Sequence, residues 1–215
     1  NCVAGREAMY RFCAEHNIPT ERCGKLVVAA TEQELPHLDA LEKKAGANGL
    51  EGLQRLSANE ISEREPHVTG IAGLYVPMTG IVDYVQVTEA FAKVVRDAGG
   101  EIRMDSRVLA VHRFGKELAL ETVQGTVRSK NLINCGGLQS DRIARMCGVE
   151  PGLQIIPFRG EYFVLVPDKC HLVRNLVYPV PDPEFPFLGV HFTRMIRGGV
   201  EAGPVFAVFA DGHHR

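Results

Sequence analysis

Hydrophobic positions near the N-terminus recur first with the period of a helix and then as an unbroken apolar run. The stretch "NCVAGREAMYRFCAEH" predicts a helix, which ends where Asn17 and Pro19 follow it. The run "CGKLVVAA" at 23–30 is short, apolar and rich in valine, which is typical of a buried strand. We therefore expect the chain to enter a sheet early.

Two further helix starts carry the capping-box signature, a Ser or Thr followed three positions later by Glu. The first is "TEQE" at 31–34, which opens a helix that continues to about Ala47. The second is "SANE" at 57–60, and its helix ends near Glu65 because Pro66 follows.

The middle of the chain combines extended segments with one amphipathic helix. "GLYVPMTGIVDY" at 73–84 is extended, and the helix after it ends at Gly99 and Gly100. Its apolar face is formed by Val87, Phe91, Val94 and Val95. The segments "EIRM", "RVLAVHRF" and "LALETV" predict successive strands, and "LIN" at 132–134 predicts a buried one.

Proline becomes frequent from Pro151 onward, and helical periodicity disappears. "GEYFVLVP" and "FLGVHFTRMI" are predicted strands, joined by a rigid loop, "YPVPDPEFPF". The chain thus has two kinds of sequence pattern, one that combines helices with strands and one of strands alone, and together they predict a mixed α/β (α+β) fold. A βαβ-like part covers about 86–148, and antiparallel sheet is predicted elsewhere.

Composition narrows the classes of function. Of the 215 residues, 45% are hydrophobic and 23% are charged, which is ordinary for a globular protein with a packed core. A net charge of −2, without a basic stripe interleaved with aromatic residues, argues against a nucleic-acid partner. No apolar run reaches the roughly 18 residues of a membrane span, and no signal peptide for secretion is visible.

The cysteines predict no metal site. They form no CxxC pair and have no zinc-like spacing to paired histidines, and the adjacent His213 and His214 match no metal pattern either. We expect free thiols in a reducing compartment at Cys2, Cys13, Cys23, Cys135, Cys147 and Cys170.

Gly136 and Gly137 stand between the predicted strand "LIN" and a helix for which Ser140 or Asp141 is the expected cap. Two interpretations are open. The glycines either form a tight turn, or they let the backbone approach a phosphate at the helix N-terminus.

The order of several motifs resembles one enzyme family. "TGIVDY", "AGGEI", "INCGGLQSDRI", "PFRGEYF" and "YPVPDPEFPFLGVHFTR", followed by Gly203-Pro204, look like the L-2-hydroxyglutarate dehydrogenases. These are FAD-dependent members of the D-amino-acid-oxidase-like superfamily. "FRGEYF" and "PFLGVHFTR" are specific to the family, whereas strand–GG–helix suits any flavoprotein of the superfamily.

The resemblance implies oxidation of L-2-hydroxyglutarate to 2-oxoglutarate by hydride transfer to FAD. It also implies that 86–150 is part of a Rossmann-like FAD-binding domain. Residues 1–85, with a helical connection, and 151–215 would then form the antiparallel-sheet substrate domain. The family's GxGxxG turn is absent, and "VFAVFADGHHR" departs from the usual continuation. We therefore expect an internal fragment that binds FAD weakly or not at all when alone.

A dianionic 2-hydroxy acid needs a base and cationic anchors. Arg159, at the head of a predicted strand, is the first candidate for a catalytic and substrate-binding cation, and Arg194 is the second. His191 is the candidate base, because "LGVHF" alternates and places Gly189, His191 and Thr193 on one face. Each of these residues also has a structural interpretation, as an edge arginine or a hydrogen-bonded core histidine.

The remaining candidates are secondary. Tyr162, Tyr178 and Tyr84 are candidate substrate ligands, although each also suits a core aromatic residue. By the resemblance, FAD would be contacted at Val108, Gly136, Gly137 and Leu138.

Two other functions stay open. The first is a related FAD-dependent amino-acid or amine oxidase, and the second is a non-catalytic remnant. Family members include mitochondrial and bacterial proteins. The expected location is therefore mitochondrial in a eukaryote and cytoplasmic or inner-membrane-associated in a bacterium. The sequence indicates neither the electron acceptor nor a membrane attachment.

Overall fold

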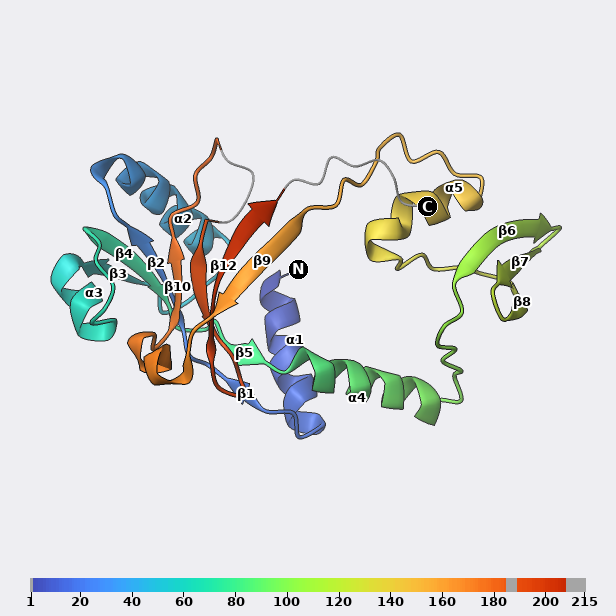
Figure 1. The fold of residues 1–215 in the computed structure, drawn as a ribbon, viewed down its shortest axis with the longest axis horizontal. Helices are drawn as coiled ribbons and strands as arrows, with labels where there is room; N and C mark the ends of the chain where they lie inside the picture. The colour runs from blue at the N-terminus through green and yellow to red at the C-terminus, as the bar shows by residue number, and fades with distance from the viewer. Residues whose placement is uncertain (1, 185–188, 208–215) are drawn as a thin grey trace. The chain divides into compact units, whose positions relative to one another are not determined.

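The computed structural model describes residues 2–184 and 189–207, and the chain divides into two compact units (Figure 1). One unit contains the chain up to Phe91 together with Gly160–Ala207, and the other contains Ala92–Arg159. The predicted roles of these parts, substrate domain and FAD-binding domain, remain predictions.

The first unit is built on a seven-stranded sheet with the order β3-β4-β2-β10-β11-β12-β9 (Figure 1). Its strands are β2 (Lys25–Ala29), β3 (Gln54–Ser57), β4 (Ala72–Val76), β9 (Arg159–Val164), β10 (Leu176–Pro179), β11 (His191–Arg194) and β12 (Val200–Ala207). The strands predicted at 23–30, in "GEYFVLVP" and in "FLGVHFTRMI" are confirmed in β2, β9 and β11.

Two details of that sheet differ from the expectation. β10 pairs parallel to β2, so the sheet is not antiparallel throughout, although β10–β11 and β11–β12 are antiparallel. The predicted loop "YPVPDPEFPF" begins inside β10, because Tyr178 and Pro179 still pair with β2. The prolines of that segment misled the prediction: Pro179 lacks an N–H but still fits the last position of a strand.

Both capping boxes are confirmed. Glu34 Oε2 accepts the Thr31 N–H at 3.1 Å before η1 (Glu32–Glu34) and α2 (Leu35–Ala47). Ser57 Oγ accepts the Glu60 N–H, and Glu60 Oε2 accepts the Ser57 N–H at 2.7 Å, which starts α3 (Ala58–Arg64). The two helices therefore begin where local hydrogen bonds dictate.

The sheet carries a hydrophobic core on each face. Leu26, Val28 and Val177 pack with Ile61 of α3 on one face. Val27 and Ala29 pack with Leu38 of α2 on the other. Alternation along β2 sends these side chains to opposite sides, so a single buried strand serves both cores.

The first unit also contains elements outside this sheet. They are α1 (Cys2–Glu15), β1 (Thr20–Glu21), β5 (Ile81–Val82), α4 (Tyr84–Asp97) and η3 (Pro167–Leu172). α1 and the start of α4 pack together through Cys13 and Val87, and Phe12 stacks on Phe91. The predicted N-terminal helix and the amphipathic helix are thus confirmed.

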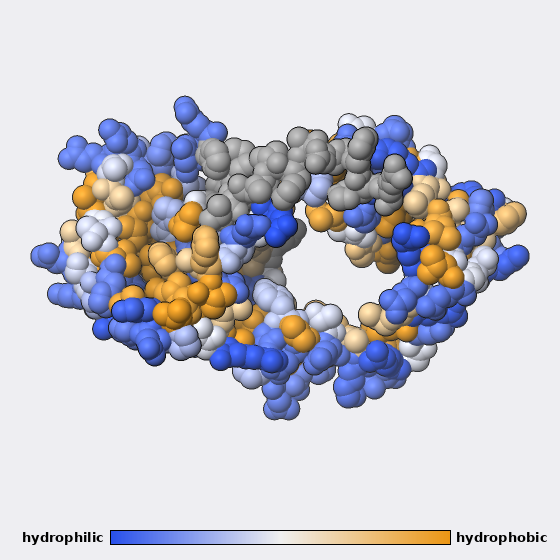
Figure 2. Space-filling view, viewed as in Figure 1, coloured by the Kyte–Doolittle hydropathy of each residue, from blue (hydrophilic) through white to orange (hydrophobic). Residues whose placement is uncertain are grey.

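Hydrophobic residues remain visible among hydrophilic ones on the face of this unit that Figure 2 shows. β9, which ends the strand order, is exposed along its whole length. Phe163 and Val164 are both about 70% exposed.

The second unit contains a three-stranded antiparallel meander and a short helix. Its elements are β6 (Val108–Phe114), β7 (Glu117–Thr122), β8 (Gly125–Ser129), η2 (Gly137–Gln139) and α5 (Ser140–Met146). The predicted strands "RVLAVHRF" and "LALETV" are confirmed as β6 and β7. They pair antiparallel with each other, whereas a βαβ unit requires parallel strands.

Two predicted strands of this unit are wrong. "EIRM" and "LIN" are not strands, and Ile133 is 84% exposed. A segment of high β-propensity forms a strand only where a partner strand can pair with it, and within the described residues β6, β7 and β8 pair only with one another.

The predicted cap at Ser140 or Asp141 is also wrong. The η2 turn precedes α5 and makes Gln139 its N-cap, while the Asp141 carboxylate instead binds Arg145 at 3.1 Å.

Two general expectations can be compared with the structure. All six cysteines are free thiols, as predicted. In the parts of the chain that the structure describes, no helix combines the length and the apolar character that crossing a bilayer requires.

Candidate functional site

Three aromatic side chains form a row across β10, β11 and β9 on one face of the sheet. Val177 pairs with Phe192, so the antiparallel register puts Tyr178 directly opposite His191. Their rings stack with centroids 4.1 Å apart and an angle of 13° between the planes. Tyr162 meets the imidazole edge-on, at 6.1 Å and 74°. We call Tyr178, His191 and Tyr162 the aromatic row.

His191 is the centre of this row and is only 4% exposed. Phe192 packs into the core of the opposite face, so the predicted alternation of β11 holds at His191. Its Nδ1 lies 2.9 Å from the carbonyl oxygen of Gly189. A carbonyl only accepts, so Nδ1 carries the proton, and in the neutral ring Nε2 is the acceptor. This tautomer suits a general base that acts through Nε2.

Tyr162 reaches His191 by crossing a glycine on the intervening strand. His191 pairs with Gly203 of β12, and β9 lies beyond β12. A Cβ at position 203 would stand 2.7 Å from Tyr162 Cδ1 and 2.8 Å from the Glu161 carbonyl oxygen. Residue 203 therefore has to be glycine for the Tyr162 ring to lie where it does.

The variant Gly203→Ala is expected to be destabilised by about 1–3 kcal/mol, the usual cost of overpacking. The added methyl group would push Tyr162 away from His191. Thermal unfolding measures the loss. Gly46→Ala is the matched control, because no atom lies within 4 Å of its Cβ position on α2 and alanine favours a helix. Equal melting temperatures for Gly203→Ala and the wild type would contradict the expectation.

Lys25 extends the row on its other side, and the sequence reasoning missed it. Its Nζ lies 3.8 Å from the centroid of the Tyr178 ring. Burial lowers the pKa of its ammonium group. Burial also raises the pKa of the Tyr178 hydroxyl group. The sequence did contain a signal for it. Lys25 is a charged residue inside the otherwise apolar strand "CGKLVVAA", where burial of its ammonium group is unfavourable unless another group compensates the charge.

The two predicted arginines do not join the aromatic row. Arg194 alternates with His191 on β11, and its guanidinium grips the Glu21 carboxylate at 2.8 and 3.3 Å and also bonds the Arg174 carbonyl. Arg159 is the exposed first residue of β9, and alternation places it on the face opposite to Tyr162. Their role as substrate anchors stays a prediction, which the geometry of Arg194 does not favour.

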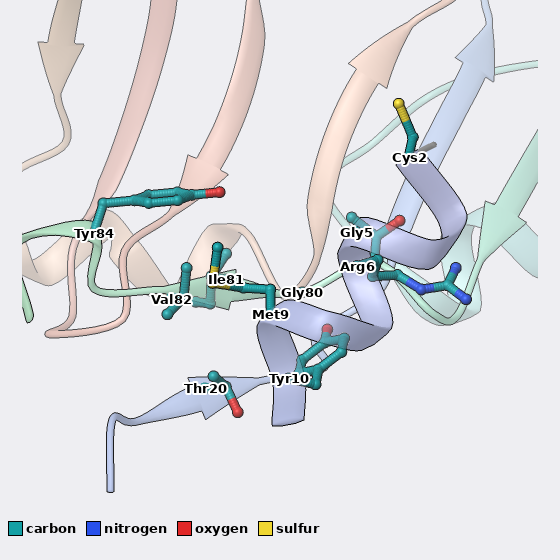
Figure 3. A pocket seen from close by; sticks show the side chains of 11 residues that line it. Cys2, Gly5, Arg6, Met9, Tyr10, Thr20, Gly80, Ile81, Val82 and Tyr84 are labelled. Atoms are coloured by element: carbon teal, nitrogen blue, oxygen red, sulfur yellow. The ribbon is translucent and has the colours of Figure 1, made fainter. Parts of the chain in front are cut away.

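Tyr84 lies in a different place from the aromatic row. It is the first residue of α4, is 68% exposed and lines a pocket of about 310 Å³. Gly5, Met9 and Tyr10 of α1 line the same pocket (Figure 3). Tyr178 does not line this pocket, and the predicted substrate contact of Tyr84 stays a prediction.

The predicted cofactor contacts all lie in the second unit. Val108 is the half-buried first residue of β6, and Leu138 is 60% exposed. A Cβ at Gly136 would meet Ile143 Cδ1 at 2.5 Å, whereas Gly137 has a φ of +54° and open space where a Cβ would stand. Packing against Ile143 therefore explains the glycine at 136, and the positive φ explains the glycine at 137, so a tight turn accounts for both. The open, exposed position 137 also fits a large ligand that approaches the backbone.

Together these groups can carry out proton abstraction. The first unit holds an imidazole whose Nε2 is the acceptor, two tyrosines that cover it, and a half-buried ammonium group. Among residues 2–184 and 189–207, no group of three His, Cys, Asp or Glu side chains has a metal-binding arrangement.

Comparison with known proteins places these features in a family. Residues 2–214 match the family described as FAD dependent oxidoreductase. L-2-hydroxyglutarate dehydrogenase from Indibacter alkaliphilus is 44% identical over 218 residues, covering 100% of this chain and 55% of that protein. The mitochondrial L-2-hydroxyglutarate dehydrogenase of Homo sapiens is 38% identical over 227 residues, covering 99% and 49%. The chain thus spans about half the length of these relatives.

A solved structure supports the fold. L-proline dehydrogenase from P. horikoshii superposes with a TM-score of 0.82 at 17% identity, over 96% of this chain and 55% of that one. At this identity the likeness concerns the fold alone. The predicted mixed α/β fold of the D-amino-acid-oxidase type is thereby confirmed.

Proposed function

The chain belongs to the FAD-dependent oxidoreductase family, and on that premise we propose that the full-length protein oxidises L-2-hydroxyglutarate to 2-oxoglutarate. The observation that carries the proposal is the 44% identity over the whole chain with a protein of that named activity. The aromatic row agrees with it, because oxidation of a hydroxyl group requires a base that removes its proton.

On the substrate side, we assign His191 as the base. With Nδ1 donating to Gly189, the substrate hydroxyl would donate its proton to Nε2. Tyr178 and Tyr162 cover the ring and limit the access of water, which strengthens electrostatic interactions with a bound anion. Of the predicted anchors, Tyr162 and Tyr178 flank the imidazole ring and would orient the carboxylates.

On the cofactor side, the backbone at Gly136, Gly137 and Leu138 and that at Val108 would hold FAD. When bound, FAD supplies the acceptor for the hydride that leaves the substrate carbon. The open space at position 137 and the exposure of Leu138 support this assignment.

The test is a substrate panel on the purified full-length protein. L-2-hydroxyglutarate should reduce the bound flavin without oxygen and should drive turnover with an artificial dye acceptor. The D-enantiomer, glycine, sarcosine and L-proline should do neither. Flavin reduction by an amino acid alone would replace this proposal with an amino-acid or amine oxidase. A full-length protein that purifies without flavin and does not take it up would favour the non-catalytic alternative.

For the location, we propose mitochondria if the source is a eukaryote, because the human relative is named as mitochondrial. In a bacterium we propose the cytoplasm or an association with the inner membrane. Fractionation of source cells, followed by immunodetection, tests both.

A further inference from the structure

We propose that Lys25 anchors the distal carboxylate of the substrate and so selects dicarboxylic over monocarboxylic 2-hydroxy acids. This inference rests on the proposed function, since it assigns part of the same site. It starts from the position of Lys25 on β2, where the next four residues are all buried. A lysine at such a position loses hydration, so its charge needs compensation.

Among the described residues, the positive charge of Lys25 is only partly compensated. The Tyr178 ring faces the ammonium group at 3.8 Å, which is a cation–π contact. No carboxylate oxygen of residues 2–184 or 189–207 forms an ion pair with Nζ. A bound carboxylate would complete the environment of this cation, and the substrate is a dianion.

The spacing between Lys25 and His191 suits such a substrate. Tyr178 lies between them. The distances from its ring centroid to Nζ and to the imidazole centroid together set an upper limit of about 8 Å on the separation of Nζ from the imidazole centre. A ligand that joins them therefore has to pass around the edge of the Tyr178 ring, with one hydrogen bond of about 3 Å at each end and several ångströms of carbon chain between. The hydroxyl group and the distal carboxylate of 2-hydroxyglutarate are separated by such a chain.

The two predicted arginines are placed less well for this role. Arg194 is held by Glu21, and Arg159 alternates to the face opposite Tyr162. Lys25 instead shares a face with Val27 and with the aromatic row, as the parallel pairing of Val27 with Tyr178 requires. The geometry thus makes Lys25 the specificity residue of this face.

The experiment compares L-2-hydroxyglutarate with L-2-hydroxyvalerate, which has the same carbon chain but no distal carboxylate. In the full-length protein, Lys25→Met should lower kcat/KM for the dicarboxylate by about 100-fold or more, the usual effect of removing a charged hydrogen-bond partner. It should change kcat/KM for L-2-hydroxyvalerate by less than about threefold, since that substrate makes no use of the charge. Lys25→Arg, which keeps the charge, should retain most of the preference.

Binding gives a readout that does not depend on turnover. Glutarate should bind the wild type and Lys25→Arg in calorimetry, and Lys25→Met should lose that binding. Equal losses of kcat/KM on both substrates would overturn the proposal, because they indicate that Lys25 only supports Tyr178. Unchanged kinetics in Lys25→Met would overturn it as well.

The two proposals fail in different ways. A wild type that does not oxidise L-2-hydroxyglutarate, but binds glutarate through Lys25, contradicts the proposed function and leaves the anchor standing. If Lys25→Met does not fold, as judged by its melting temperature, Lys25→Gln serves as the uncharged variant under the same criteria.

Discussion

Replacing His191 by Phe in the full-length protein is expected to lower kcat with L-2-hydroxyglutarate by about 10²–10⁴-fold, the contribution of a general base. Phenylalanine keeps a flat ring against Tyr178 and Tyr162 but has no nitrogen to accept the hydroxyl proton. The loss should therefore fall on kcat, because the ring stack that shapes the site is preserved. Steady-state kinetics with a dye acceptor provide the measurement.

Chemical rescue separates a base from a structural histidine. In His191→Ala, which leaves space where the ring stood, added imidazole should restore part of kcat. The rescued rate should follow the concentration of neutral imidazole, because imidazolium also fills the space but cannot accept a proton; rescue that does not depend on this concentration would indicate a structural role. The control is His171→Phe, since His171 is an exposed residue of η3 and its replacement should leave kcat unchanged. If kcat falls by less than tenfold in His191→Phe, His191 is a structural residue and not the base.

Local signals in the sequence predicted the elements of the first unit well. The capping boxes at Thr31 and Ser57 act within three residues, so their hydrogen bonds form wherever the chain leads afterwards. The face of His191 followed from alternation along a single strand. The strand "LIN" was wrong because a strand depends on a neighbour, which residue types within the segment do not specify.

The contacts that make the candidate site are not local. β10 pairs with β2 across about 150 residues of sequence, and that pairing brings Tyr178 to Lys25. Glu21 binds Arg194 across a similar separation, so this predicted substrate anchor already has a carboxylate partner. Alternation along a strand predicts which face of the sheet a side chain occupies. Which side chains meet on that face depends on the strand order, which the sequence did not predict. Lys25 was therefore missed although its strand was predicted.

The second large effect is expected on stability, from Glu65→Ala. Glu65 follows α3, and its side chain is fully buried. Its two carboxyl oxygens accept the N–H of Arg174 at 3.1 and 3.0 Å, and Oε1 also accepts the N–H of Asn175 at 2.5 Å. These residues lead directly into β10, so the carboxyl group fixes the start of the strand that carries Tyr178.

Alanine would leave both backbone N–H groups without an acceptor in a buried place. Each lost hydrogen bond to a carboxyl group and each stranded donor costs about 1–3 kcal/mol, so we expect the free energy of unfolding to fall by about 3–4 kcal/mol. Urea unfolding of the full-length protein measures it. Glu65→Gln keeps one acceptor oxygen and should lose about half as much, whereas Glu63→Ala, on the exposed side of α3, should lose almost nothing. Equal stabilities for Glu65→Ala and Glu63→Ala would show that the buried carboxyl group does not hold β10 in place.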